Sequence, residues 1–326
     1  MTAPRGWHRW GARALGLAGL ALAVLAMTYV VQVGGRGADA GRSAVATGPV
    51  GAAGERVEAR PLRIGWTAWA DAEVVTLLAT RLIENHLGHE VERVMADIGI
   101  QYQGVAQGNL DLMLMAWLPT THRQYWRQVR TRVVDLGPIY SGRLGWVVPD
   151  RVPPADLDSI EDLRRPAIAA RLGGRIQGID PGSGLMQASE RALQVYGLDD
   201  LRLVPASGAA MTAVLERAMR DPDRWVVVTA WQPHWIFARH RLRFLADPRG
   251  VLGHTEQIHA VARREFGRDY PRVVALLSRF HLGAEELDAL LLQARDSSPT
   301  AAVEAFLADH PRRVEYWLSG RLPEDG

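Results

Sequence analysis

The chain of 326 residues contains no cysteine and no lysine. Without cysteine it forms no disulfide, and it cannot carry a lipid on an N-terminal cysteine. A body of this size buries enough apolar surface to fold without cross-links, so the absence does not argue against export. All 38 basic residues are arginine, which we attribute to genome composition rather than to function.

Excess positive charge is missing from most of the chain. The first 60 residues carry seven arginines against three acidic residues, which leaves 31 basic and 33 acidic residues in the rest. The body therefore offers no basic stripe for binding nucleic acid.

Residues 14–33 form a charge-free apolar run that follows three arginines. A positively charged start before an apolar segment predicts export, so we expect a periplasmic or otherwise extracytoplasmic protein. The run is long enough to span a bilayer, and the small-x-small sequence at 38–40 is a possible cleavage site. Two interpretations stay open: residues 1–40 are a cleaved signal peptide or a retained anchor in the inner membrane.

Residues 41–60 are rich in glycine, alanine and serine and predict a flexible linker. Beyond it, strands alternate with helices in two successive runs, which predicts an α/β fold with parallel sheets. A late strand and C-terminal helices follow the second run, so the chain is expected to cross twice between two lobes. We expect lobe 1 to comprise residues 61–147 and 254–326, lobe 2 to comprise residues 148–253, and the ligand to bind in the cleft between them.

The sequence predicts the bounds of three elements. The helix that begins near residue 70 should end near Gly88, because glycine commonly ends helices. A strand is expected over residues 142–149, closed by Pro149, and the returning strand over residues 256–266.

Three Ala-Trp dipeptides end at Trp69, Trp117 and Trp231, each after a predicted strand or in its exit loop. Prolines two residues after the second and third tryptophans should stop those strands and hold the indoles at the mouth of the sheet. Covering the hydrophobic core is one explanation for each ring. Gathering all three in the cleft is the other, and it would form an aromatic cage. Such a cage suits a quaternary ammonium, because a methylated cation cannot donate hydrogen bonds and is held by ring faces, each worth about 0.5–2 kcal/mol.

The segment "IQGIDPGSGLMQ" (176–187) reads as a strand, a Gly/Pro/Ser turn and the start of a helix. Such a turn exposes backbone N–H groups at a helix N-terminus, where a carboxylate or another anion can bind. A tight strand–helix connection would explain the same glycines, and both interpretations stay open. The segment matches neither of the common nucleotide-binding glycine motifs.

The histidines give no argument for a metal. His86 and His89 lie near a helix end without an apparent third ligand, and His234 and His240 are six residues apart. His122 follows Trp117 by five residues, so it is placed to donate a hydrogen bond in the same cleft. No set of residues makes a case for catalysis, and no cofactor or metal is expected.

Eight stretches together resemble the glycine betaine-binding proteins of osmoprotectant ABC importers. They are "AWADAE", "DLMLMAWLPTTH", "GWVVP", "SIEDL", "GIDPGSGLM", "GAAMTAVL", "VVVTAWQPHWIF" and "EQIHAVARREF". The resemblance covers roughly residues 62–318. It implies a two-lobed periplasmic-binding-protein fold of type II, a betaine ligand and an ABC permease as partner.

The resemblance also implies a binding site. The trimethylammonium group would lie among Trp69, Trp117 and Trp231. The ligand carboxylate would be held by His122 and by the backbone amides of Gly178 and Ile179. The stretch before Trp69 is one residue longer than the usual form of the motif, so Trp66 competes with Trp69 as the first cage member.

The sequence therefore predicts a solute-binding protein, not an enzyme, which captures glycine betaine or a related betaine for an ABC transporter. Choline, carnitine or proline betaine are the alternative ligands. A sensing module tethered to the membrane by a retained N-terminal segment is the alternative class of function.

Overall fold

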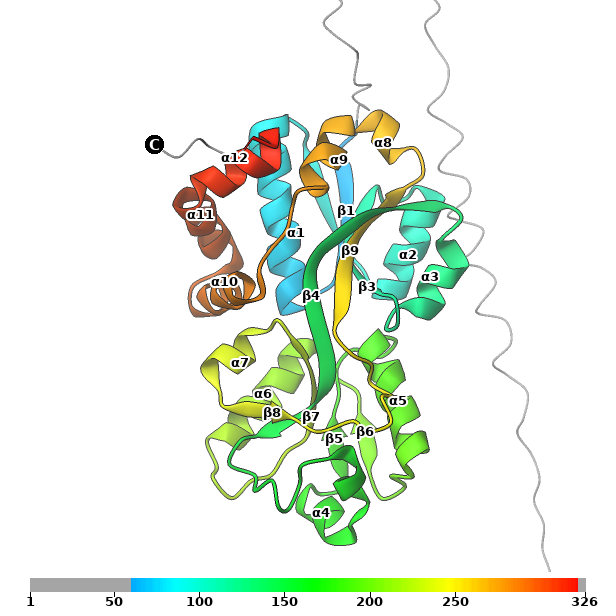
Figure 1. Ribbon diagram of the computed structural model, residues 1–326, viewed down its shortest axis with the longest axis vertical. Coiled ribbons are helices and arrows are strands. Elements are labelled where there is room, and N and C mark those ends of the chain that lie inside the picture. The colour runs from blue at the N-terminus through cyan, green and yellow to red at the C-terminus, as the bar shows by residue number, and fades with distance from the viewer. Residues whose placement is uncertain (1–59, 322–326) are drawn as a thin grey trace, which may run out of the picture. The chain divides into compact units, whose positions relative to one another are not determined.

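The computed structural model describes residues 60–321 (Figure 1). The predicted signal peptide or anchor (1–40) and nearly all of the predicted linker (41–60) lie outside the described residues. Within residues 60–321, no helix combines the length and the apolar character that crossing a bilayer requires.

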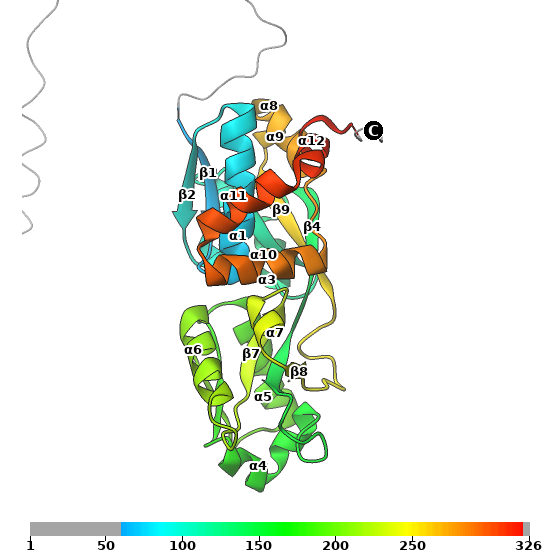
Figure 2. The ribbon, with the colours of Figure 1, turned by 90° about the vertical axis from the view of Figure 1, so that its left-hand side faces the viewer.

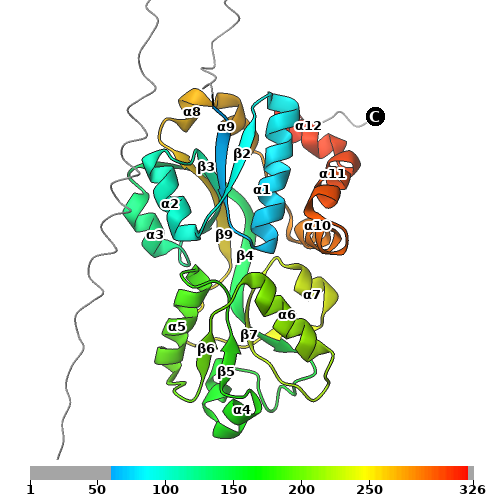
Figure 3. The same cartoon turned by 180° about the vertical axis from the view of Figure 1, so that it is seen from behind.

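Lobe 1 is built on a sheet with the strand order β2-β1-β3-β9-β4 (Figure 3). β1 runs parallel to β2 and β3, and β9 runs antiparallel to β3 and β4. Its strands are β1 (Leu62–Trp66), β2 (Val91–Met95), β3 (Leu112–Leu118), β9 (Glu256–Arg263) and the first part of β4 (Val133–Pro149). Its helices are α1 (Ala70–Leu82), the π-helix η1 (Ile83–Leu87), α2 (Ile98–Gln107), α3 (Arg123–Val129), α8 (Phe266–Asp269), α9 (Pro271–Leu277), α10 (Ala284–Asp296), α11 (Pro299–Asp309) and α12 (Pro311–Ser319).

Lobe 2 continues the same path of hydrogen-bonded strands in the order β4-β7-β5-β6, with β8 also paired to β4. Its strands are the second part of β4, β5 (Arg175–Gln177), β6 (Arg202–Val204), β7 (Val228–Gln232) and β8 (Leu242–Phe244). Its helices are the 3₁₀-helix η2 (Ile160–Arg164), α4 (Pro166–Arg171), α5 (Gly184–Tyr196), α6 (Gly208–Met219) and α7 (Trp235–Arg239). Figure 3 shows this second set of elements below the first.

The long strand β4 connects the two lobes. Its residues up to Gly142 pair with β9, residues 143–147 pair with β7, and residues 147–149 pair with β8. The sequence predicted a strand only over residues 142–149, so its first half was missed. That half contains Gly137 and Pro138, residues that disfavour strands, and its ladder with β9 shifts register beside both. The second crossing follows β8, where the chain returns to lobe 1 as β9, which ends at Arg263 rather than at residue 266.

The helix that begins at Ala70 ends as predicted near Gly88. Its α-helical part stops at Leu82, one further turn has π-helical hydrogen bonding, and Gly88 follows with φ of 74°. A left-handed φ suits glycine because it has no Cβ. After Gly88 the chain enters β2.

The strand β3 lies in the centre of the lobe 1 core. All seven of its residues are buried, which agrees with the unbroken apolar run in the sequence. β3 ends at Leu118 and β7 ends at Gln232, so both strands stop directly before the prolines expected to end them. Trp117 and Trp231 therefore occupy matching places, one residue before the end of their strands.

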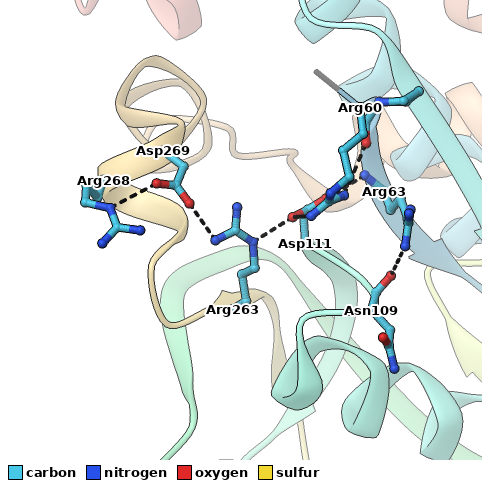
Figure 4. Close-up of polar contacts among 8 residues, drawn as sticks. Arg60, Arg63, Asn109, Asp111, Arg263, Arg268 and Asp269 are labelled. Atoms are coloured by element: carbon cyan, nitrogen blue, oxygen red, sulfur yellow. Dashed lines mark hydrogen bonds and ion pairs between the residues drawn. The ribbon is translucent and has the colours of Figure 1, made fainter. Parts of the chain in front are cut away.

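A buried ion-pair network fixes the beginning of the described chain to lobe 1 (Figure 4). Arg60 donates two hydrogen bonds to the carboxylate of Asp111, at 2.8 and 2.9 Å. Arg263 donates to Asp111 at 2.6 Å and to Asp269 at 2.7 Å. Asp111 is fully buried, so these charges compensate one another where water is excluded.

Helix α10 of lobe 1 lies beside α7 of lobe 2, as Figures 1 and 2 show. Arg239 pairs with Asp296 at 2.5 Å, and Arg295 pairs with Glu216 of α6 at 3.3 Å. Helix α10 thus contacts both α6 and α7 of lobe 2.

Candidate functional site

A pocket lies between the two lobes. It is lined by Trp69, Trp117, Thr121, His122, Leu144, Ile179, Ser183, Gly184, Leu185 and Trp231. Five of the six site residues expected from the sequence are in this lining. Gly178 is the exception.

Trp117 forms one wall from lobe 1. It lies near the end of β3, and its six-membered ring packs on Gly142 at the point where β4 leaves lobe 1. A Cβ on Gly142 would come within 2.4 Å of the ring, so only glycine leaves room for the indole there. The close packing fixes the ring where the lobes join.

Trp69 and Trp231 form the adjoining walls from opposite lobes. Their ring centroids are 6.3 Å apart and the planes are tilted by 57°. Trp69 is the residue before α1, and Trp231 lies on β7 opposite Leu144 of β4. The rings of Trp231 and His234 meet edge to face at 4.7 Å. All three tryptophans are buried and line one pocket, as a cage for a methylated cation requires.

The indoles of Trp69 and Trp231 each donate a hydrogen bond to a carboxylate of the opposite lobe. Trp69 Nε1 donates to Asp180 Oδ2 at 3.0 Å, and Trp231 Nε1 donates to Asp71 Oδ1 at 3.0 Å. Tyr140 donates to the second oxygen of Asp71 at 2.8 Å. Burial raises the pKa of Asp71 to about 6, although these two donors lower it.

His122 is buried and neutral. Burial lowers its pKa to about 3, and its Nδ1 accepts a hydrogen bond from the backbone N–H of Trp117 at 3.1 Å. Because Nδ1 accepts, the proton of the neutral ring is on Nε2. His122 therefore presents an N–H donor from a ring that lines the pocket.

Backbone N–H groups complete the polar side of the pocket. Ser183 caps α5 by accepting from Met186 N, which leaves the first two amides of the helix, Gly184 and Leu185, without an intrahelical acceptor. In residues 60–321, no hydrogen bond is formed by the N–H of either residue or by that of Ile179. The N–H of Gly178 donates instead to Val204 O at 2.8 Å, so it is already used within lobe 2.

The loop that carries His122 is held by Glu256 at the start of β9. The carboxylate of Glu256 accepts from the backbone N–H groups of Thr120 and Thr121 and from the hydroxyl of Thr121. The loop reaches lobe 2, where Thr121 and His122 lie against Gly184. Neighbouring Tyr125 also donates to Gly182 O at 2.5 Å.

Trp66, the competitor of Trp69, lies outside the pocket. It ends β1 with its ring under the guanidinium of Arg93 at 5.9 Å, whereas Trp69 lines the pocket. His259 pairs with Asp135 at 2.8 Å, also away from the site. Residues 60–321 contain no group of three or more histidine or acidic side chains placed to hold a metal ion.

Sequence reasoning missed the polar residues that hold the cage. Asp71 stands two residues after Trp69, but nothing in the sequence indicates its bond to Trp231, 160 residues away. Asp180 and Glu256 were quoted within motifs without a role. A carboxylate in the first turn of a predicted helix beside an aromatic motif is the one signal that could have pointed to Asp71.

The family model of the substrate-binding domain of ABC-type glycine betaine transport systems matches residues 60–309. The chain belongs to this family. The family comprises substrate-binding proteins of transporters, and the substrate-binding proteins of ABC importers are extracytoplasmic.

Two solved structures of relatives share the fold. Lactococcal OpuAC, in its closed conformation with glycine betaine, is 32% identical, with a TM-score of 0.72 over 80% of this chain and 100% of that chain. ProX from Borrelia burgdorferi, a glycine betaine/L-proline-binding protein, is 27% identical, with a TM-score of 0.74 over 79% and 97%. The predicted two-lobed periplasmic-binding-protein fold is thereby confirmed.

The glycine betaine/carnitine transport binding protein GbuC of Listeria monocytogenes is 38% identical over 154 residues. This match covers 46% of this chain and 51% of GbuC, so the chain spans about half the length of this curated relative.

Proposed function

We propose that the protein binds glycine betaine between its lobes and delivers it to an ABC permease. The single observation that carries this proposal is the pocket, in which three indoles from two lobes adjoin hydrogen-bond donors with no arginine in the lining. A cage of rings recognises the trimethylammonium group, and neutral donors recognise the carboxylate.

The cage half of the site consists of Trp69, Trp117 and Trp231. A quaternary ammonium brings no hydrogen-bond donor, so ring faces and apolar contact are its best partners, worth about 0.5–2 kcal/mol per ring. Burial of the three rings raises this value, because water competes less for the cation.

The carboxylate half consists of the His122 Nε2–H and the amide of Ile179, as expected, joined by the amides at the start of α5. The positive end of the helix dipole favours an anion at Gly184 and Leu185. Gly178 was expected to donate as well. We leave it out of the proposal because its N–H is already bonded to Val204 O.

Isothermal titration calorimetry with glycine betaine, choline and glycine tests the proposal. Glycine keeps the carboxylate and lacks the methyl groups, and choline keeps the methyl groups and lacks the carboxylate. We expect saturable binding of glycine betaine, weaker binding of choline and none of glycine. Tight binding of choline with no binding of betaine would keep the cage and overturn the carboxylate half.

The remaining expectations extend this proposal. Residues 1–40 export the chain and then either are cleaved or anchor it, and the lobe boundaries fall at 147/148 and 253/254. The protein is a carrier and catalyses no reaction. A retained anchor would instead support the second candidate function, a tethered sensing module, and N-terminal sequencing of the exported protein distinguishes the two.

A further inference from the structure

Two hydrogen bonds cross the cleft in opposite directions. Trp69 of lobe 1 donates to Asp180 of lobe 2, and Trp231 of lobe 2 donates to Asp71 of lobe 1, both at 3.0 Å. Of these two rings each lobe therefore supplies one, together with the carboxylate that holds the ring of the other lobe.

The two carboxylates differ in surroundings and agree in geometry. Asp71 is fully buried in the first turn of α1 and also accepts from Tyr140. Asp180 is half-buried in the turn before α5, where its own backbone carbonyl accepts from Ser183 N. An N–H bond to a carboxylate is stronger than one to a neutral acceptor, and an indole has a single N–H, so each bond fixes the direction of one ring edge.

Trp117 is the natural contrast within the cage. It is positioned by packing on Gly142 inside its own lobe, and in residues 60–321 its indole N–H has no carboxylate partner. Separating the lobes would break both of the other bonds, whereas the packing of Trp117 on Gly142 does not bridge the cleft. Only two of the three walls thus depend on closure for their orientation.

We propose that Asp71 and Asp180 are positioning residues that form a reciprocal latch, which orients Trp231 and Trp69 when the lobes close and so links cage assembly to closure. This inference rests on the proposed function for the identity of the ligand. The latch itself is a property of the two lobes with or without ligand. It predicts that each aspartate acts only through the N–H of its own tryptophan.

Double-mutant cycles test that prediction. Asp71→Ala and Asp180→Ala should each weaken glycine betaine binding by about tenfold, the value of one hydrogen bond to a charged group. Phenylalanine keeps a ring and removes the N–H. In the Trp231→Phe background, Asp71→Ala should therefore change affinity by less than about twofold, and Asp180→Ala should do the same in the Trp69→Phe background.

Conservative variants separate positioning from general damage. Asn keeps an oxygen that accepts the indole N–H, so Asp71→Asn and Asp180→Asn should recover most of the affinity lost in the alanine variants. Crossing the pairs supplies the matched control: Asp180→Ala in the Trp231→Phe background should keep its full effect. An equal loss for each aspartate in all backgrounds would overturn the latch.

The absence of cysteine makes closure directly measurable. Two introduced cysteines, Arg127→Cys on α3 and Gln194→Cys on α5, lie at exposed positions on opposite lobes and take a pair of fluorescent dyes. Single-molecule energy transfer should show a smaller closed fraction in Asp71→Ala and Asp180→Ala than in the wild type, both without ligand and with betaine. An unchanged closed fraction in both variants would overturn the inference.

The two proposals fail in different ways. If the wild type does not bind glycine betaine, the proposed function is wrong, and the ligand-free closed fractions still decide the latch. If the wild type binds and both aspartate variants bind and close like it, the proposed function stands and the latch is wrong.

Discussion

The two lobes contribute unequal halves to one pocket. Lobe 1 supplies two indoles and a histidine, all as side chains at or near the ends of α1 and β3. Lobe 2 supplies one indole from β7 and backbone N–H groups beside α5. Lobe 1 alone would offer part of a cage with one donor, and lobe 2 alone would offer an anion site beside a single ring.

Under the proposed function, this division explains how binding favours the closed form. A ligand with a cation at one end and a carboxylate at the other gains its full contacts only when both lobes meet around it. Ligand therefore shifts the equilibrium toward closure by its difference in affinity for the two forms. Substitutions and a change of pH can separate the contributions of the lobes.

The largest effect concerns stability, because each lobe buries one neutral histidine beside the cage. Burial lowers the pKa values of His122 and His234 to about 3, so the unfolded chain binds more protons below pH 6.5 and acid favours unfolding. Between pH 7 and 5 each histidine should cost about 2 kcal/mol of unfolding free energy. Asp71 acts in the opposite direction. Because its pKa is raised to about 6, lowering the pH from 7 to 5 adds about 1 kcal/mol to the free energy of unfolding.

Chemical denaturation at pH 7 and pH 5 measures this loss. His122→Gln and His234→Gln should each remove about half of the histidine contribution. A stability that is flat from pH 7 to 5 in the wild type would contradict the burial of both rings in their neutral form.

Removing one ring from either lobe tests whether both belong to one cage. Trp117→Ala in lobe 1 and Trp231→Ala in lobe 2 should each weaken glycine betaine binding by at least about tenfold, or 1.4 kcal/mol. Calorimetric titration provides the measurement, with Trp66→Ala as a control outside the pocket. Near-native affinity in both variants would show that these rings do not form a cage around the ligand.

A matched pair of glycines tests the contact between the lobes. Gly184 and Gly208 are both the first residue of a helix capped by serine, but a Cβ on Gly184 would lie 2.4 Å from Thr121 Cγ2 of lobe 1. A Cβ on Gly208 meets its neighbours only at 3.8 Å. Gly184→Ala should weaken binding by about five- to tenfold by obstructing closure, and Gly208→Ala should not. Equal affinities of the two variants would show that the lobes need not approach this closely.

The smallest effect distinguishes recognition of the carboxylate from recognition of the quaternary ammonium. His122→Ala should weaken glycine betaine binding by about fivefold, close to the value of one hydrogen bond, and should leave choline nearly unaffected because choline has no carboxylate. Competition titrations of both ligands give the ratio of the two losses in affinity. Equal losses for the two would take His122 out of the carboxylate site.

The side-chain half of the site could be predicted from the sequence, and the backbone half only in part. Trp117 and Trp231 each stand before a proline that ends a buried strand, a pattern that fixes where the ring must lie. Resemblance alone put the amide of Gly178 in the site. The turn pattern pointed instead to the start of a helix, where the structure has the unpaired amides of Gly184 and Leu185.

Pairings between distant segments could not be predicted from the sequence, for a physical reason. The first half of β4 is held by partners in β9 more than 100 residues away, which offset the cost of Gly137 and Pro138. Asp71 and Trp231 are likewise joined only by the fold. Local patterns record the propensity of a segment and do not record which distant segment it will meet.

The aromatic cage is tested most simply by the proton NMR signal of the N-methyl groups of bound glycine betaine. Ring currents from three surrounding indoles should move this signal well upfield of its free position, and replacing Trp117 by alanine should return part of that shift. A ligand that binds with its N-methyl signal at the free position would contradict the cage of Trp69, Trp117 and Trp231.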